Sequence, residues 1–207
     1  MINFKNKKIL ITGASGGIGN ALVKKFVSLK GDVLATGTKT EKLDALKKNF
    51  PNIYILKFDI SDHSKIEEFI ENVSSQLVGL DVLVNNAASI IVGKFEKFTY
   101  DDLISTFTVN LVSSYMLSLH VIKKMKEKKN GVIVNIISGV ANIGLPFLSL
   151  YGIGKSSLRA FSESISVELK EDNIDVIMVS PGAMNTAQEK KQKLIGIEKS
   201  PYENMKK

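Results

Sequence analysis

Short apolar runs alternate along the chain with longer segments in which apolar residues recur every three or four positions. Continuous apolar runs predict strands buried on both faces, and the three-to-four spacing predicts helices. The expected strands are 8–11, 33–35, 53–56, 82–84, 132–137 and 176–179. The expected helices are 18–29, 40–49, 61–77, 101–127 and 151–170. In the third helix Ser61 is the expected N-cap, and Ser64 with Glu67 is an expected capping box.

Strands that alternate with helices predict an α/β fold of three layers, in which helices cover both faces of a parallel sheet of six strands. A chain of 207 residues is long enough for one such domain. We expect the domain to span residues 1–186 and to be followed by a basic, flexible segment at 187–207. That segment has no strand pattern, so the last strand would leave an open sheet edge. Three explanations are open: another subunit covers the edge, the chain is truncated, or the protein is naturally short.

The net charge of +7 comes from two segments of the chain. Residues 123–129 carry +4 at an expected helix C-terminus, where cations complement the helix dipole, and residues 189–207 carry +3. Neither segment mixes its lysines with aromatic residues that would stack on bases. We therefore interpret both as solvated charge and expect no nucleic-acid partner.

Several other classes of site are excluded by composition. The chain has no cysteine, and its two histidines are isolated, so we expect no metal site. No run approaches the ~18 apolar residues of a membrane span, and the N-terminus shows no secretory signal. The expected location is cytoplasmic, without a membrane partner.

A glycine-rich loop at residues 12–19 directly follows the first expected strand and opens the first expected helix. Gly13, Gly17 and Gly19 permit a tight turn and let the backbone approach a ligand closely. The N–H groups and the positive dipole end of the helix attract a diphosphate. We therefore prefer a dinucleotide site to the simpler interpretation of a glycine-rich turn.

One polar residue interrupts an apolar stripe of the expected helix 101–127. Asn110 takes a place on this face where Leu would be expected. The stripe consists of Leu103, Phe107, Asn110, Ser114, Leu117 and Val121. An unpaired buried amide costs roughly 1–3 kcal/mol, so Asn110 should have partners, either in a structural hydrogen bond or in a link to an active site. A second stripe of Ile104, Leu111, Tyr115 and Ile122 indicates that the helix is covered on two sides, and another subunit is one candidate for the second cover.

Three further residues have the chemistry to move a proton. Tyr151 and Lys155 are four residues apart and share a helix face, and Ser138 follows a buried strand. The reference pKa of a tyrosine is near ~10, and a neighbouring ammonium group favours the phenolate. We expect these side chains to protonate or deprotonate one oxygen atom of a substrate, with Ser138 as a hydrogen-bond donor to that oxygen.

Taken together, these motifs resemble the short-chain dehydrogenase/reductases over residues 8–186. The loop resembles T-G-x-x-x-G-I-G, residues 85–88 resemble N-N-A-G with Ala88 in place of Gly, and residues 181–186 resemble P-G-x-x-x-T. Within that family, the motifs resemble those of 3-oxoacyl-carrier-protein reductases and related carbonyl reductases. The resemblance implies a doubly wound Rossmann fold, a homodimer or homotetramer, and an NAD(P)-dependent oxidoreductase. Such an enzyme reduces a carbonyl to a secondary alcohol, or catalyses the reverse reaction.

The resemblance also implies roles for single residues. The catalytic set would be Asn110, Ser138, Tyr151 and Lys155. Tyr151 would be the acid/base, Lys155 would tune the phenol and bind the nicotinamide ribose, and the main chain of Asn110 would hold a water in a proton relay. The implied cofactor-binding residues are Gly13, Ser15, Gly17, Ile18, Gly19, Thr38, Lys39, Asp59, Ile60, Asn86, Ala87, Ala88, Tyr151, Lys155, Pro181, Gly182 and Thr186.

The end of the second strand bears on the choice of cofactor. A carboxylate there binds the ribose 2′-hydroxyl of NAD, whereas this chain has Thr38 and Lys39, so NADP(H) is favoured and NAD(H) stays open. The resemblance implies that Asp59 meets the adenine amino group and Ile60 the adenine ring, although Asp59 also fits a turn before a helix. The alternative function is a nucleotide-binding sensor or scaffold with the same fold and little turnover.

Overall fold

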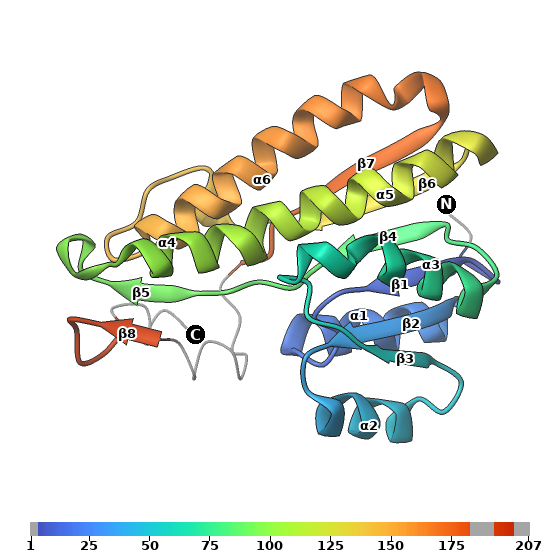
Figure 1. Cartoon of the computed structure of the whole chain (residues 1–207), viewed down its shortest axis with the longest axis horizontal. Helices are drawn as coiled ribbons and strands as arrows, with labels where there is room; N and C mark the ends of the chain where they lie inside the picture. Colours follow the sequence, from blue (N-terminus) through green and yellow to red (C-terminus); the bar gives the residue numbers. More distant parts are fainter. Residues whose placement is uncertain (1–3, 183–192, 201–207) are drawn as a thin grey trace.

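The computed structural model describes residues 4–182 and 193–200, which form a main sheet between layers of helices (Figure 1). The strands of the main sheet are β1 (Lys8–Ile11), β2 (Asp32–Gly37), β3 (Tyr54–Lys57), β4 (Val82–Asn85), β6 (Gly131–Ile136) and β7 (Ile174–Val179). The α-helices are α1 (Gly17–Ser28), α2 (Thr40–Asn49), α3 (Ile66–Leu77), α4 (Tyr100–Phe107), α5 (Ser113–Lys128) and α6 (Ser149–Glu168).

The main sheet has the strand order β3-β2-β1-β4-β6-β7, and every neighbouring pair is parallel. Leu10 of β1 lies opposite Leu34 of β2 on one side and Leu83 of β4 on the other, and all three are fully buried. The predicted α/β fold with six parallel strands is confirmed. The chain winds outward in one direction from β1 to β3 and in the other from β4 to β7, so the topological switch point lies between β1 and β4.

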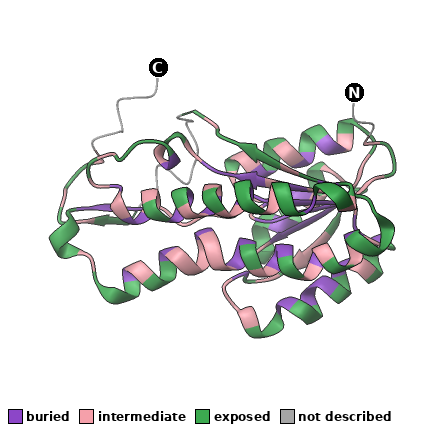
Figure 2. Cartoon of the chain, turned by 90° about the horizontal axis from the view of Figure 1, so that it is seen from above, coloured by how far each residue is buried: buried purple, intermediate pink, exposed green. Residues whose placement is uncertain are grey.

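Two apolar clusters fill the space between the sheet and the helices. One cluster joins the sheet to α3 and α5, and the other joins the opposite face to α1 and α2. Successive strand residues point to opposite faces, so the neighbours Ile9 and Leu10 belong to different clusters. Burial accordingly follows the strands and the inner faces of the helices (Figure 2). These clusters hold the strand ends, where the candidate site residues lie, in a fixed arrangement.

Strand β7 forms one edge of the main sheet. Among the described residues it pairs only with β6, and Ile177, Met178 and Val179 are 37%, 37% and 40% exposed. The expected open edge is therefore present in the described part of the chain.

The third helix begins later than predicted. It starts at Ile66 after a short 3-10 turn. Ser61 donates through its N–H and its Oγ to Asp59 Oδ1, and Ser64 Oγ donates to Asp62 Oδ1. Neither serine caps the helix, so the predicted N-cap and capping box are wrong. The nearby aspartate side chains take the serine donors in local turns instead.

A second, two-stranded sheet lies beside α4 (Figure 1). In it β5 (Ile91–Gly93) pairs in parallel with β8 (Lys193–Ile195). We expected no strand in this part of the chain, and β8 corrects that interpretation. Lys193 also forms an ion pair with Asp102 of α4, with Nζ and Oδ1 2.6 Å apart. The segment that follows the main domain is thus fastened to the domain at residues 193–195.

Asp102 combines this ion pair with the capping box of α4. Thr99 donates to Asp102 Oδ2 through its N–H and its Oγ1, and the Asp102 N–H donates to Thr99 Oγ1. Lys193 and then Thr99 lower the pKa of Asp102 to about 2. The carboxylate therefore stays charged at neutral pH and links β8 to the start of α4.

The predicted helix 101–127 is one continuous helical segment with a π-turn in its middle. The π-turn, Thr108–Val112, connects α4 to α5. Asn110 is the middle residue of this turn and is fully buried. Single π-turns inside α-helices occur frequently at functional sites, so the polar residue in the apolar stripe coincides with a distortion of the helix.

Candidate active site

Most of the predicted site residues follow the carboxyl ends of the parallel strands. Residues 13–19 follow β1, residues 38–39 follow β2, residues 59–60 follow β3, residues 86–88 follow β4, Ser138 follows β6 and residues 181–182 follow β7. The carboxyl ends of parallel strands share one edge of the sheet, and ligands of such folds bind outside that edge at the switch point. The glycine loop after β1 and the segment after β4 flank the switch point on its two sides.

The glycine loop is tightly folded against the segment after β4. Gly13 has a φ of +61°, and a Cβ atom there would lie 2.8 Å from Ala87 Cα. A Cβ atom at Gly19 would lie 2.3 Å from the carbonyl oxygen of Gly13. Gly16 is the N-cap of α1, and neither a cap side chain nor an acidic residue occupies the first turn. The N–H groups of this turn therefore suit an anion such as a diphosphate.

Thr12 fixes the loop to β4 and was not among the predicted site residues. Its Oγ1 accepts hydrogen bonds from the N–H groups of Asn86 and Ala87, at 3.0 and 3.1 Å. Asn86 Nδ2 donates in return to the carbonyl oxygens of Thr12 and Gly13. Asn86 thus shapes the loop with its side chain. A threonine between a buried strand and a glycine turn is the sequence signal for this role. Ala88 has no positive φ, so its methyl group causes no backbone strain.

The expected cofactor-binding residues that follow β2 and β3 differ in their exposure and in their hydrogen-bond partners. A Cβ atom at Gly37 would lie 3.3 Å from Ser15 Oγ, so the end of β2 adjoins the glycine loop, and Thr38 and Lys39 are exposed beside it. Asp59 is exposed, but its Oδ1 already accepts from Ser61. Ile60 is only 8% exposed and belongs to a core cluster. The side chain of Ile60 therefore has little surface for an adenine ring.

Asn110 has the partners that its position in the apolar stripe required. Its Oδ1 accepts from the Ser89 N–H and its Nδ2 donates to the Ser89 carbonyl oxygen, both at 2.8 Å. Helix α6 packs against the same turn, because a Cβ atom at Gly154 would lie 3.1 Å from Asn110 Cβ. The side chain of Asn110 is therefore structural, and it joins the segment after β4 to the π-turn next to Lys155.

Tyr151 and Lys155 lie in the first two turns of α6, beside the end of β6. Lys155 Nζ is 5.9 Å from the centre of the Tyr151 ring and donates to the Ile136 carbonyl oxygen at 2.7 Å. Ser138 follows Ile136 by two residues, and Ser156 Oγ of α6 donates to Ala141 in the loop after it. The structure therefore brings Tyr151 and Lys155 together with the strand end that carries Ser138.

Among the titratable residues that the structure describes, Lys155 is the most unusual in its burial and its pKa. It is 2% exposed, and burial lowers its pKa from 10.5 to about 8. A buried ammonium group is costly, and perturbed pKa values cluster at functional sites. The group can gain or lose its charge much closer to neutral pH than an ordinary lysine.

Three further expectations concern the residues after β7, metal ligands and membrane-spanning helices. Thr186 lies outside the described residues, whereas Pro181 and Gly182 begin two residues after the end of β7, at the expected edge. Within residues 4–182 and 193–200, no three acidic or histidine side chains gather as metal ligands. No helix in that part of the chain is long and apolar enough to cross a bilayer.

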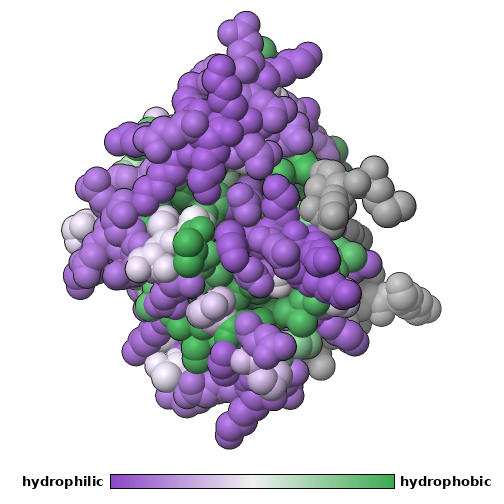
Figure 3. Space-filling model, turned by 90° about the vertical axis from the view of Figure 1, so that its right-hand side faces the viewer, coloured by the Kyte–Doolittle hydropathy of each residue, from purple (hydrophilic) through white to green (hydrophobic). Residues whose placement is uncertain are grey.

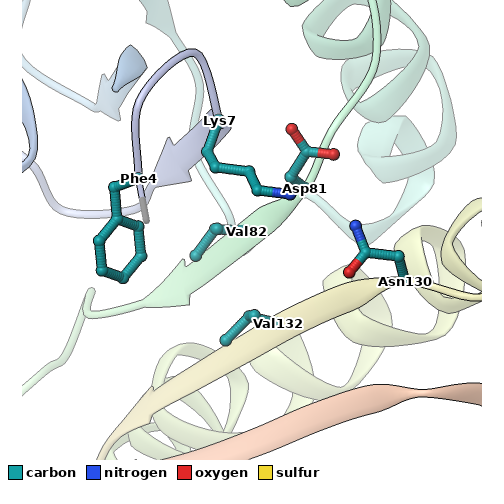
Figure 4. Close-up of a pocket in the computed structure, with 6 residues that line it drawn as sticks. All are labelled: Phe4, Lys7, Asp81, Val82, Asn130 and Val132. Atoms are coloured by element: carbon teal, nitrogen blue, oxygen red, sulfur yellow. The ribbon is translucent and has the colours of Figure 1, made fainter. Parts of the chain in front are cut away.

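Two features lie away from this edge of the sheet. A small hollow opens at the amino ends of β1, β4 and β6, at the opposite edge (Figure 4). It is lined by Phe4, Lys7, Asp81, Val82, Asn130 and Val132.

At the end of α5, Lys124 pairs with Glu71 and Lys126 pairs with Asp172. The molecule is mainly hydrophilic at the end shown in Figure 3. These ion pairs agree with the interpretation of the basic run as solvated charge.

This chain is similar in sequence to known proteins. The family model described as short chain dehydrogenase matches residues 7–194. A 3-oxoacyl-[acyl-carrier-protein] reductase FabG of Rickettsia typhi is 34% identical over 182 residues, which are 88% of this chain and 74% of that protein. A dehydrogenase/reductase SDR family protein 7-like of Anopheles gambiae is 30% identical over 194 residues, 89% of this chain but only 61% of that protein.

A solved structure shows the same fold. The short-chain dehydrogenase from Streptomyces avermitilis superposes with a TM-score of 0.86 at 31% identity, covering 97% of this chain and 74% of that one. The family match spans every strand of the main sheet, from β1 to the residues after β7. Sequence, fold and site geometry thus agree that this chain belongs to the short chain dehydrogenase family.

Proposed function

We propose that this chain is an NAD(P)-dependent oxidoreductase that reduces a carbonyl to a secondary alcohol, or catalyses the reverse, with Tyr151 as the acid/base. The observation that carries the proposal is the position of Lys155. This buried lysine lies beside the Tyr151 ring and donates to the end of β6, two residues before Ser138. A cation held next to a phenol favours the phenolate and eases proton transfer in either direction.

The glycine loop fits the dinucleotide that this reaction needs. Gly13 and Gly19 leave no room for a Cβ atom within the loop, and the first turn of α1 offers N–H groups without a capping side chain. The loop with Thr38, Lys39 and the segment after β4 would bind the cofactor, and Lys155 would bind the nicotinamide ribose. The bound nicotinamide supplies or accepts the hydride.

The residues of the chain then handle the oxygen of the substrate. As the carbonyl carbon is reduced, negative charge grows on the oxygen. Ser138 donates a hydrogen bond to that oxygen, and Tyr151 donates the proton that completes the alcohol. Lys155 stabilises the phenolate that remains. A water on the main chain of the Asn110 π-turn would return a proton from solvent. In the oxidative direction the same groups act in reverse.

Turnover of a carbonyl panel tests the proposal. The purified chain is mixed with NADPH or NADH and with ketones, aldehydes and a β-ketoacyl thioester, and the loss of absorbance at the nicotinamide band is followed. The thioester is included because a 3-oxoacyl-[acyl-carrier-protein] reductase is among the relatives. Oxidation of the cofactor with any substrate supports the enzyme. Tight cofactor binding without turnover across the panel would instead support the sensor or scaffold.

Preference for NADP(H) is part of the proposal and depends on Lys39. We expect Lys39→Ala to raise the KM for NADPH about tenfold and to leave the KM for NADH unchanged. A hydrogen bond to a charged group is worth about 1.5–3 kcal/mol, and about 1.4 kcal/mol is a factor of ten. Steady-state kinetics with both cofactors measures the effect. Lys42→Ala, an equally exposed change one turn away on α2, is the control. Equal KM changes for both cofactors would contradict the assignment.

Gly19 provides a test of the cofactor site that does not depend on turnover. We expect Gly19→Ala to weaken dinucleotide binding about 5- to 150-fold, because the new Cβ atom forces the loop open at an overpacking cost of roughly 1–3 kcal/mol. Fluorescence titration with NADPH measures the affinity. The matched control is Gly144→Ala, since a Cβ atom at Gly144 meets nothing within 4 Å. Wild-type affinity in Gly19→Ala would exclude the loop as the dinucleotide site.

We also propose that the chain forms a homodimer or homotetramer through α5. Tyr115 and Leu119 of this helix are 46% and 42% exposed, and Tyr115 contacts Phe161 of α6 at 5.1 Å between ring centres. Tyr115→Asp should lower the molar mass measured by light scattering after gel filtration to that of a monomer, because a buried unpaired charge opposes association. Tyr54→Asp is the control, since Tyr54 is 44% exposed on β3. An unchanged mass in Tyr115→Asp would exclude this interface.

A further inference from the structure

Four buried polar side chains form a continuous chain of hydrogen bonds between two helices. We name this set the amide chain; its members are Ser118, Asn85, Asn135 and Ser162. It runs from α5 across β4 and β6 to α6. Asn85 Nδ2 donates to Asn135 Oδ1 at 2.8 Å and to Ser118 Oγ at 3.3 Å. Asn135 Nδ2 donates to Ser162 Oγ at 2.8 Å. All four residues are at most 2% exposed.

The direction of these hydrogen bonds is fixed by the two serines at the ends. Ser118 Oγ donates to the Ser114 carbonyl oxygen and Ser162 Oγ donates to the Leu158 carbonyl oxygen, each one helical turn back. A hydroxyl group has one proton, so each serine can only accept a hydrogen bond from its asparagine neighbour. Both asparagines must therefore turn their NH₂ groups toward the helices. The hydrogen bonds of the amide chain thus have a single arrangement.

This arrangement is costly for the fold. Asn85 and Asn135 are register partners near the carboxyl ends of two inner strands of the sheet, where Val or Ile would pack without polar groups. Asn85 Oδ1 is buried and has no hydrogen-bond partner. An unsatisfied buried polar atom destabilises the fold, so core stability alone does not account for the amide chain.

The amide chain adjoins the residues of the candidate site. Asn85 immediately precedes Asn86, which shapes the glycine loop. Asn135 immediately precedes Ile136, whose carbonyl oxygen accepts from Lys155 Nζ. Ser162 lies two turns beyond Lys155 on the same face of α6. Helix α6 is therefore fastened to β6 at two successive strand residues, once by Ser162 and once by Lys155.

We propose that the amide chain is a positioning device that holds α6 against β6, and so keeps Lys155 buried beside the strand end that carries Ser138. Ser162 is its decisive member, because it is the contact on α6 itself. Its effect on turnover rests on the proposed function, whereas its effect on the burial of Lys155 does not.

Two substitutions at Ser162 test the proposal. Ser162→Ala removes the acceptor for Asn135 Nδ2. Ser162→Cys nearly preserves the volume of the side chain but weakens this hydrogen bond, since sulfur is a weak acceptor. The matched control is Ser166→Ala, one turn further along α6, where the hydroxyl donates to the Glu163 carbonyl oxygen in an exposed hydrogen bond. Burial of Lys155 is measured by competitive acetylation at pH 7 and peptide mass spectrometry, with the exposed Lys170 as internal reference. Turnover and NADPH affinity are measured in parallel.

We expect Ser162→Ala and Ser162→Cys to raise the acetylation rate of Lys155 at least about fivefold, because one lost hydrogen bond changes an opening equilibrium by about this factor. The kcat should fall at least about tenfold while the Kd for NADPH changes less than about twofold, and Ser166→Ala should change none of these quantities. The proposal is overturned if both Ser162 variants acetylate Lys155 at the rate of Ser166→Ala. If the wild type turns over no carbonyl, the proposed function fails, and the acetylation rates still decide the role of the amide chain.

Discussion

Tyr151→Phe should lower kcat at least about 1,000-fold and leave the affinity for NADPH within about twofold of the wild type. The substitution removes only the phenolic oxygen, which we assign as the proton donor to the substrate. A positioned acid or base contributes roughly 100- to 10,000-fold to a rate, so its loss should be visible in the chemical step alone. The aromatic ring stays in place 5.9 Å from Lys155 Nζ, so the packing of α6 should be preserved.

The measurement is steady-state turnover with the best substrate of the carbonyl panel, together with fluorescence titration of NADPH. Tyr54→Phe is the matched control, because it removes the same atom from an exposed tyrosine on β3, away from the switch point. If Tyr151→Phe retains near-normal turnover, Tyr151 is not the acid/base. A loss of kcat accompanied by an equal loss of cofactor affinity would also contradict the assignment, because it would indicate general disruption of the site.

The main sheet could be predicted because its strands are unusually uniform. Three of the four residues in each of β1 and β4 are apolar and buried, so each of these strands is visible as an apolar run. The predicted and observed boundaries differ by one residue at most for β1, β3, β4 and β6, and by up to two residues for β2 and β7. The alternation of strands with helices leaves few topologies, and the observed order β3-β2-β1-β4-β6-β7 is one of them.

The second sheet could not be predicted because nothing local encodes it. Each of its strands has only three residues, and β5 and β8 are about one hundred residues apart in the chain. The ion pair between Lys193 and Asp102 depends on the same long-range contact. A three-residue apolar run does not distinguish a strand from a loop, so only the tertiary structure identifies its partner.

The candidate site was partly visible in the sequence for a related reason. Asn110 was detectable because a polar residue in an apolar stripe must have buried partners, but its partner Ser89 and the π-turn were not detectable. Asn135 was hidden for the opposite reason, because a single polar residue within a strand looks like a solvent-facing position. Its hydrogen bonds to Asn85 and Ser162 join residues 50 and 27 positions away. Long-range polar contacts are thus the part of the site that periodicity does not reveal.

Lys155→Met should abolish most turnover and also change how the stability of the fold depends on pH. Methionine has a similar length and no charge, so it fills the buried position without an ammonium group. Without the cation, the Tyr151 phenolate is less stable, and kcat should fall at least about 100-fold. The variant also lacks a group whose pKa burial lowers from 10.5 to about 8.

The sign of the pH effect follows from this lowered pKa. Between pH 8 and pH 10.5 the unfolded wild type binds the Lys155 proton and the folded wild type has released it, so unfolding takes up a proton and the free energy of unfolding rises with pH. Below pH 8 both states are protonated, and the full cost of the buried charge destabilises the fold. Relative to Lys155→Met, the wild type should therefore gain about 2–3 kcal/mol between pH 7 and pH 10.

Urea unfolding of both proteins at pH 7 and pH 10 measures this difference, and contributions from all other titratable groups cancel in the comparison. The control is Lys170→Met, which removes an exposed lysine and should show no pH-dependent difference from the wild type. A constant difference between the wild type and Lys155→Met at the two pH values would mean that Lys155 keeps an ordinary pKa. The lysine would then be too well solvated to be held where the proposed mechanism needs it, between the Tyr151 ring and the end of β6.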